Sequence, residues 1–280
     1  MNNNLPSKMN FMQYVATNSI QNAIQKIVGQ DSQRFISAIT SAVTTNSQLS
    51  ECTNDSIVSG ALLGEGLKLS PSPQFGQYYL VPFNIADKRD EKGKVVSWKK
   101  VAQFQLGYKG YIQLAIRSGQ YKDIDVIEVK EGEYLGRDSS TGKHNFNFIT
   151  DEIERESRET IGYMAYFEYL NGFYKNIYWS KEKMGKHAIE YSKSYAEDKK
   201  KKTDYSFWSK DFDGMAFKTM IRQLISKWGI MSVEFQRAYE NDMAVVENNK
   251  PRYVDNEDTI QPGTIDEKID KKVVKLSELQ

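Results

Sequence analysis

Apolar side chains recur at helical spacing through the first 70 residues of the chain. The spacing predicts helices over residues 11–29, 35–43 and 55–62, each with one apolar face that packs against a neighbour. The opposite faces are mostly Asn, Gln, Ser and Thr, so they do not strongly repel a copy of the same chain. We therefore expect residues 1–50 to form a helical oligomerisation segment, although packing within one chain explains the same apolar faces.

After Pro71 and Pro73 the pattern becomes alternating, which predicts strands over residues 76–86 and 94–106 joined by a polar loop. One face of the second strand is apolar, with Val96, Trp98, Ala102, Phe104 and Leu106. The other face carries Ser97, Lys99, Gln103 and Gln105. A helix closed by a glycine follows over residues 107–119. Further strands are predicted over residues 124–129, 146–149, 161–170 and 173–179, the last two joined by the hairpin signal Asn171-Gly172.

From Ser180 onward the pattern is helical again, with helices over residues 181–195 and 209–228 separated by a loop. The composition turns polar and charged at about residue 248, which predicts a flexible tail over residues 248–280. Within it, Ile269, Val273 and Leu276 are spaced for a short amphipathic helix that a partner could bind. The expected fold class is therefore α+β, in which N-terminal helices and a core over residues 51–247 precede a disordered tail. That core is a central antiparallel sheet, or a set of hairpins, packed with helices.

Charge is distributed in blocks, although the formal net charge of the chain is only +1. Residues 76–122 and 171–230 each have a net charge of +6, whereas the intervening residues 123–170 have −7. Two basic blocks that converge in space form a surface for a polyanion such as a nucleic acid. Alternating charge also keeps a chain soluble, so both interpretations stand at this point.

Several classes of protein are disfavoured by composition. The single cysteine excludes an intramolecular disulfide framework, and with only two histidines a Cys/His zinc site is not expected. No apolar run approaches the roughly 20 residues that span a bilayer, and the first residues lack a signal peptide's apolar segment. We therefore expect a cytosolic protein without a membrane partner. The nearest approach to an ATP-binding loop is Gly214-Met-Ala-Phe-Lys-Thr219, where Phe217 occupies the required glycine position.

Basic residues are spaced by four on two of the expected helices. Lys109, Gln113 and Arg117 form one polar stripe beside an apolar face, and Lys218 and Arg222 repeat the arrangement. Lysine and arginine at this spacing suit a phosphodiester backbone. A single such helix is more commonly explained by long side chains that extend beside a core stripe. The repetition in both basic blocks favours the nucleic-acid interpretation.

Two other functions remain open. Glu128 and Lys130, after Asp123 and Asp125, are similar to a metal-dependent nuclease motif, in which carboxylates hold magnesium and a lysine assists the attacking water. The motif is short and lies in the acidic block. The second alternative is a phage structural or assembly protein whose basic blocks bind an acidic partner.

Residues 50–240 resemble the RecT family of phage single-strand annealing proteins, and are close to members from phages of Gram-positive bacteria. The resemblance is carried, in order, by Leu63-Gly-Glu-Gly-Leu-Lys-Leu-Ser-Pro71, Gln77-Tyr-Tyr-Leu-Val-Pro-Phe83, Gly107-Tyr-Lys-Gly-Tyr-Ile-Gln-Leu-Ala-Ile-Arg-Ser-Gly119, Phe207-Trp-Ser-Lys-Asp-Phe-Asp-Gly-Met215, Lys218-Thr-Met-Ile-Arg-Gln-Leu224 and Ser232-Val-Glu-Phe-Gln-Arg-Ala238. The chain departs from the family pattern at Phe217 and at Gly229-Ile230.

The resemblance implies ATP-independent annealing in the bacterial cytoplasm, ring-shaped or helical homo-oligomers, and a phage exonuclease as partner. The host single-strand-binding protein is a second candidate partner. We expect no catalytic residue and no required cofactor, and the effect of Mg²⁺ on DNA binding stays open. The first candidates for phosphate contacts are Lys109, Arg117, Lys218 and Arg222. The further DNA-binding candidates are Lys99, Lys100 and Lys122, followed by Tyr108 and Gln113.

Overall fold

The computed structural model describes residues 9–247 and 250–253 of the chain. It begins with four helices, which are α1 (Phe11–Val15), α2 (Asn18–Val28), α3 (Ser32–Thr45) and α4 (Asn54–Gly66). The first predicted helix is broken at residues 16–17, where Thr17 is the N-cap of α2 and its hydroxyl bonds to the Tyr14 carbonyl. The short α1 has its own capping box, in which Asn10 and Gln13 satisfy each other's backbone N–H.

A long antiparallel hairpin follows these helices, formed by β1 (Tyr78–Arg89) and β2 (Val95–Leu106). The predicted strands are confirmed, but the predicted alternation of β2 holds only in part. Ala102, Phe104 and Leu106 are buried as expected, whereas Val96 and Trp98 are exposed because the far end of the hairpin extends beyond the core. Gln103 and Gln105, on the face expected to be polar and exposed, are also buried. Two short strands, β8 (Ala244–Glu247) and β9 (Lys250–Tyr253), extend the sheet in the order β1-β2-β8-β9. Residues 250–253, which we expected in the tail, therefore pair with β8. The rest of the expected tail, including the predicted amphipathic helix, lies outside the described residues.

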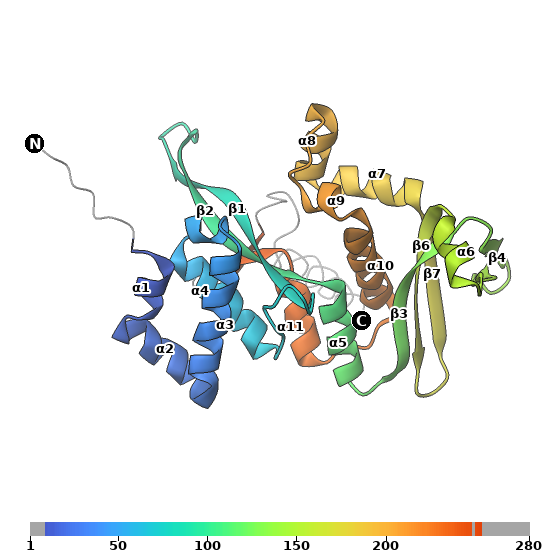
Figure 1. Cartoon of the computed structure of the whole chain (residues 1–280), viewed down its shortest axis with the longest axis horizontal. Coiled ribbons are helices and arrows are strands. Elements are labelled where there is room, and N and C mark those ends of the chain that lie inside the picture. The colour runs from blue at the N-terminus through green and yellow to red at the C-terminus, as the bar shows by residue number, and fades with distance from the viewer. Residues whose placement is uncertain (1–8, 248–249, 254–280) are drawn as a thin grey trace, which may run out of the picture.

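The second sheet has the order β3-β6-β7 and is antiparallel throughout. Its strands are β3 (Tyr121–Lys130), β6 (Thr160–Tyr169) and β7 (Tyr174–Ser180), and α5 (Tyr108–Arg117) joins the two sheets. A small hairpin of β4 (Tyr134–Arg137) and β5 (His144–Phe146), followed by α6 (Glu152–Ser157), lies at the end of the molecule opposite α1 (Figure 1). The sequence pattern predicted neither β4 nor α6.

The C-terminal half contributes α7 (Lys181–Tyr191), α8 (Lys193–Lys201), α9 (Phe207–Lys210), α10 (Phe212–Trp228) and α11 (Val233–Asn241). The loop prediction for residues 196–205 was wrong over most of its length, because α8 continues to Lys201. The helix has almost no apolar stripe, and the buried Asp198 carboxylate stabilises it by accepting hydrogen bonds from Thr203, Ser206 and Ser209.

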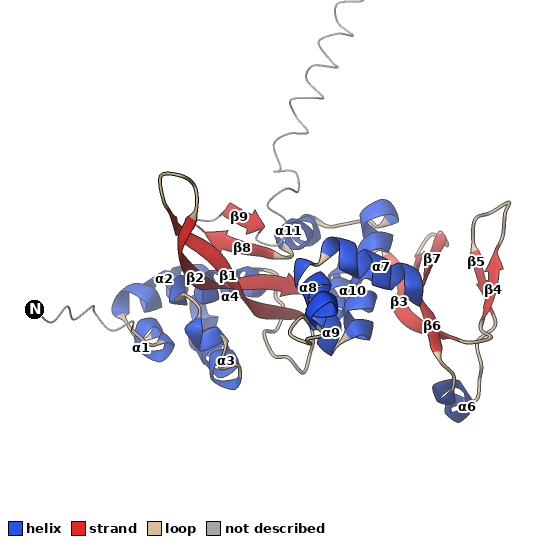
Figure 2. Cartoon of the chain, turned by 90° about the horizontal axis from the view of Figure 1, so that it is seen from above, coloured by secondary structure: helices blue, strands red, loops and turns tan. Residues whose placement is uncertain are grey.

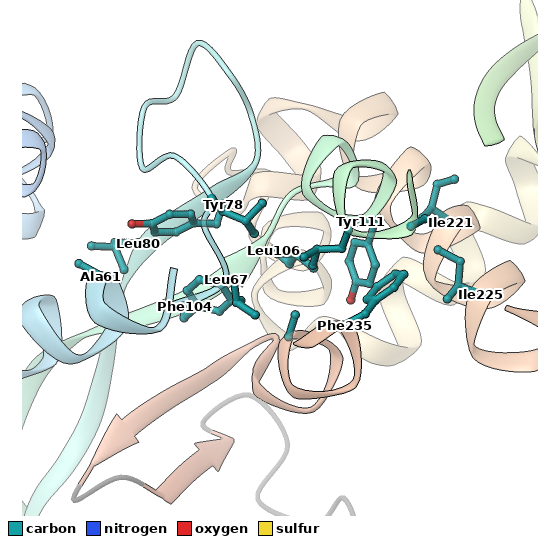
Figure 3. Close-up of a cluster of buried hydrophobic side chains, with 14 of the residues drawn as sticks. Ala61, Leu67, Tyr78, Leu80, Phe104, Leu106, Tyr111, Ile221, Ile225 and Phe235 are labelled. Atoms are coloured by element: carbon teal, nitrogen blue, oxygen red, sulfur yellow. The ribbon is translucent and has the colours of Figure 1, made fainter. Parts of the chain in front are cut away.

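One hydrophobic core joins the N-terminal helices to the second sheet. In Figure 3 the chain of contacts runs from Ala61 on α4 through Phe104 on β2 to Tyr111 on α5 and Ile221 on α10. Seen from above, α10 lies between the two sheets (Figure 2). The α+β fold class with antiparallel sheets is confirmed. Among the helices of the described part, none has the length and apolar character needed to cross a bilayer.

Candidate nucleic-acid interface

A cleft lies between the β1–β2 hairpin on one side and helices α7, α9 and α10 on the other. It consists of two hollows of about 490 and 250 Å³. The hollows are continuous because both are lined by Gln105, Phe207, Met215 and Lys218. The β1–β2 hairpin and α10 each carry a family-like motif, and both line this one depression.

The floor of the cleft is built around the buried carboxylate of Asp242, which follows α11. The Lys218 ammonium donates to one of its oxygens at 2.9 Å, and the Arg222 guanidinium donates to the other at 2.7 Å. The Tyr111 hydroxyl and the Leu106 backbone N–H also donate to this carboxylate, each at 2.8 Å. We call Asp242, Lys218, Arg222 and Tyr111 the floor cluster. It ties β2, α5, α10 and α11 together.

The charges of the floor cluster do not cancel, because two cations meet one carboxylate. Burial by itself would raise the pKa of the Asp242 carboxyl, but Lys218 and Arg222 outweigh that effect and hold the pKa below its ordinary value. The carboxyl is therefore ionised at neutral pH. Arg222 keeps 30% of its side-chain area exposed, and its guanidinium stacks 4.3 Å from the centre of the Tyr239 ring. The excess positive charge is thus presented to the cleft in a fixed orientation.

Neutral hydrogen-bonding groups continue from the floor along β2. Gln105 donates to Gln103, which in turn donates to the Met243 carbonyl beside Asp242. Both glutamines are buried, on the strand face that the sequence pattern assigned to polar residues. Aromatic rings complete the narrower hollow, where Tyr79 and Phe207 are partly exposed and Tyr108 packs edge-on against Phe217. Lys210 adds a further exposed cation to this lining.

Three of the nine residues predicted to bind DNA line the cleft, namely Tyr108, Lys218 and Arg222. The expected geometry of Lys218 needs correction, because only 6% of the residue is exposed and its ammonium faces Asp242. The four-residue spacing on α10, which we interpreted as a grip on phosphates, first serves to hold a carboxylate. Only Arg222 of this pair combines that role with substantial exposure.

The other predicted residues lie outside the cleft lining. Arg117 donates to the backbone carbonyls of Leu67 and Lys68, at 2.7 and 2.9 Å, and so fastens α5 to the end of α4. Lys100 pairs with Glu51, and Lys122 pairs with Glu168 across β3 and β6. Those three side chains have intramolecular partners.

Lys109 is more exposed than Lys99 and Gln113. Lys109 is exposed beside Tyr108, with its ammonium 5.9 Å from the centre of that ring. Lys99 and Gln113 are partly buried, on β2 and α5 respectively. The two predicted basic stripes therefore do not meet as one continuous row, since the α5 stripe borders residues 67–76 and the α10 pair borders Asp242.

Sequence reasoning missed Asp242, Gln105, Lys210, His187 and Tyr191, all of which belong to the cleft or its floor. Asp242 belongs to an acidic part of the sequence, and no local pattern links it to a helix about 20 residues earlier. His187 and Tyr191 are spaced by four, which gave a detectable signal of a shared helical face.

The residues of the nuclease alternative are separated by the pleat of β3. Asp123 and Asp125 point to one face of the strand, whereas Glu128 points to the other with the buried Ile124 and Val126. Lys130 donates to Glu128 at 2.5 Å and to Thr160 at 2.8 Å, so it belongs to a cross-strand network. Within the described residues, no group of three or more His, Cys, Asp and Glu side chains is arranged to hold a metal ion. The carboxylates of the motif therefore do not converge.

A cleft with a fixed excess cation, neutral amides and exposed aromatic rings has the features of a surface for a single-stranded nucleic acid. Comparison with known proteins agrees with this class. The RecT family matches residues 33–255, and the chain belongs to that family. The protein RecT of Escherichia coli (strain K12) is 30% identical over 212 residues, which cover 75% of this chain and 71% of that protein. The uncharacterised protein YqaK of Bacillus subtilis (strain 168) is 38% identical over 225 residues, covering 79% of this chain and 67% of its own length.

Family membership gives the function in general terms. Proteins of the RecT family bind single-stranded DNA, form oligomers and anneal complementary strands in DNA recombination, and this chain is one of them. The match extends the resemblance predicted from residues 50–240 into α3 at one end and into β9 at the other.

Proposed function

We propose that the protein binds single-stranded DNA in the cleft and anneals complementary strands without ATP. The observation that carries the proposal is the floor cluster, in which Asp242 fixes Lys218 and Arg222 and leaves one positive charge in excess. Phosphate is common to every nucleotide, so an oriented cation holds a strand whatever its sequence. Arg222 contacts phosphate directly, and Lys218 contributes through its charge. Lys109 and Lys210 bind the strand further along its path, with Lys99 at the hairpin.

Annealing is possible in this arrangement because the protein holds the DNA by its backbone. Contacts to the backbone leave the Watson–Crick edges free for a second strand. A row of subunits that holds a strand extended has already ordered it, so pairing spreads with a smaller entropy cost for each base pair. Oligomers in the form of a filament or a ring supply such a row.

Independence from ATP is supported by the position of residues 214–219. These residues lie within α10, where their backbone groups take part in the helix, and the Gly214 N–H donates to Asp211. A phosphate-binding loop needs free backbone N–H groups, so this segment is unsuited to the triphosphate of ATP. We propose that no cofactor is required and that Mg²⁺ acts, at most, as a counterion of the DNA.

The partners follow from the reaction. We propose that α1 and α2 supply a contact between subunits, since Met9, Met12 and Ile27 are exposed on them or beside them. Annealing requires single strands, so a phage exonuclease that exposes them is the expected partner in the bacterial cytoplasm. The host single-strand-binding protein, which occupies the same DNA, is the second partner proposed.

The first test is annealing of two complementary fluorescent oligonucleotides in buffer with EDTA and without nucleotide. Protein-dependent duplex formation is expected, and a non-complementary pair serves as the control. An oligomer that shows no preference for DNA would instead indicate a structural or assembly protein. Loss of full-length DNA only after addition of Mg²⁺ would indicate a nuclease.

The role of the cleft floor is tested with Arg222→Gln and Arg222→Lys. The glutamine variant is expected to bind single strands more weakly and to lose about 0.7 from the slope of log affinity against log salt, the value for one phosphate contact on a single strand. The lysine variant keeps the charge and is expected to keep the slope. Lys227→Gln, at an exposed position of the same helix outside the cleft lining, is the matched control. An unchanged slope in the Arg222→Gln variant would contradict the proposed contact.

A further inference from the structure

Three aromatic side chains form a continuous row on the wall of the larger hollow. Trp179, near the end of β7, lies 5.2 Å from His187 on α7 when ring centres are compared, and His187 lies 4.5 Å from Tyr191. All three line the hollow, together with Phe83 of the facing hairpin. We call Trp179, His187 and Tyr191 the aromatic strip. It exists because positions 187 and 191 share one face of α7 and the chain enters that helix directly from Trp179.

The outer part of the strip is not used by the hydrophobic core. Tyr191 is 51% exposed and does not belong to the hydrophobic side chains that pack the core, whereas Trp179 does. Packing within the subunit therefore does not explain the ring of Tyr191. Its position beside a cavity that also holds Arg222 and Gln105 places an apolar face in a polar, cationic cleft.

Cations border the strip on two sides. The Lys183 ammonium lies 4.2 Å from the centre of the Trp179 ring, and Lys183 is exposed. Arg222 lines the same hollow from α10. A nucleotide has an anionic phosphate at one end and an apolar, flat base at the other. The larger hollow offers a charged group for the first and ring faces for the second.

We infer that the aromatic strip is the base-stacking wall of the cleft and that it takes the unpaired bases of single-stranded DNA, with Tyr191 as the exposed platform. This inference rests on the proposed binding of single strands in the cleft. Stacking is tolerant of sequence, because every base has a flat face. It also leaves the Watson–Crick edge free, so it is compatible with annealing.

The aromatic strip would distinguish single-stranded DNA, the substrate of annealing, from the duplex that is its product. Both faces of a base inside a duplex are covered by neighbouring base pairs, so a duplex has no face to offer to the strip except at its ends. The strip therefore stabilises the bound single strand but not the annealed duplex. Phosphate contacts, in contrast, remain available in both.

The test compares two ligands with the same backbone, an oligothymidylate and an abasic oligonucleotide of equal length. Tyr191→Ala is expected to weaken binding of the oligothymidylate by about fivefold or more, the usual effect of losing one stacked base, and to leave binding of the abasic strand unchanged. Tyr191→Phe keeps the ring and is expected to bind both ligands as the unaltered protein does. Tyr205→Ala removes a ring that is 78% exposed and does not line the cleft, so it should change neither affinity.

Equal weakening on both ligands would show that Tyr191 acts through the fold or on the phosphates, and would overturn the inference. So would an unchanged affinity of Tyr191→Ala for the oligothymidylate. The proposed function fails by a separate result, namely if the unaltered protein neither binds the oligothymidylate nor anneals complementary strands. If the unaltered protein anneals strands and the Tyr191→Ala variant binds both ligands normally, the proposed base-stacking role of the strip is wrong. The proposed annealing function is then unaffected.

Discussion

At the scale of single residues, the feature with the largest energetic consequence is Asp242. Its side chain is buried, and its carboxylate accepts hydrogen bonds from both Lys218 and Arg222. Removing one partner of a buried ion pair leaves the other charge uncompensated in a poorly solvated site. Asp242 thus positions the cations of the cleft and, at the same time, supports the packing of β2, α5, α10 and α11.

Asp242→Asn is expected to lower the free energy of unfolding at neutral pH by roughly 3–5 kcal/mol, the usual cost of breaking a buried pair. The pKa of this carboxyl in the folded protein lies below its ordinary value of 3.8. Its stabilisation is therefore complete above about that pH and is lost as the pH falls through the lower folded-state value. In urea unfolding experiments the difference between the variant and the unaltered protein should therefore stay constant from pH 7 down to about 3.8 and shrink below that pH.

The matched control is Asp204→Asn, which removes an exposed carboxylate outside the floor cluster and should change stability little. A difference between Asp242→Asn and the unaltered protein that stays constant as the pH falls well below 3.8 would contradict the assigned ion pairs.

At the scale of elements, much of the fold was predictable because burial imposes a local period. The β1–β2 hairpin, α5, the β6–β7 hairpin and α10 appeared as alternating or helical patterns, within a few residues of their observed bounds. The patterns failed where tertiary contacts replace an apolar stripe. In α8 only Tyr195 and Asp198 are buried, so the sequence was interpreted as a loop. β8 and β9 are too short to show a period, and they exist by pairing with one another and with β2.

The candidate site was predictable to a smaller degree for the same reason. The spacing of Lys218 and Arg222 identified a helix face but not the group that the face meets. That group, Asp242, is brought in by α11. A periodic pattern predicts which face of an element is buried, but it does not predict which residue of another element that face contacts.

The two glycines of the Gly107-Tyr-Lys-Gly110 motif allow α5 to pack closely against the backbone of another segment. A Cβ atom at Gly110 would lie 2.1 Å from the Gln77 carbonyl oxygen, and one at Gly107 would lie 2.1 Å from that of Gly76. The first turn of α5 therefore rests directly on the backbone that enters β1.

Gly110→Ala is expected to destabilise the protein by about 1–3 kcal/mol, because the obstacle is backbone and cannot rotate away. The helical control is Gly185→Ala in α7, where a Cβ atom would meet nothing within 4 Å. That change should stabilise by up to about 1 kcal/mol, as alanine favours a helix over glycine. Thermal or urea unfolding measures both, and a neutral Gly110→Ala would contradict the close approach.

At the scale of the whole molecule, the N-terminal helices are part of the subunit's core as well as the proposed contact between subunits. Phe11, Ile24, Phe35 and Ile39 are buried in the same cluster as the sheet residues. Deleting residues 1–50 would therefore remove core side chains, and a loss of oligomers would not separate assembly from folding. Point substitutions on the exposed face avoid this difficulty.

Met12 and Ile27 are 63% and 66% exposed, so a charge at either position is compatible with the folded subunit. The double variant Met12→Lys, Ile27→Lys is expected to shift the oligomers to smaller species by size-exclusion chromatography with light scattering, because a contact that buries both side chains cannot accommodate two ammonium groups. Its unfolding temperature should change little. Val233→Lys on α11 is the control, at a position 70% exposed on another part of the surface.

If the double variant assembles like the unaltered protein, α1 and α2 do not form the subunit contact, and annealing would have to be organised by another face. If it dissociates yet still binds single strands, the cleft is complete within one subunit and assembly serves only to align neighbouring clefts along the DNA.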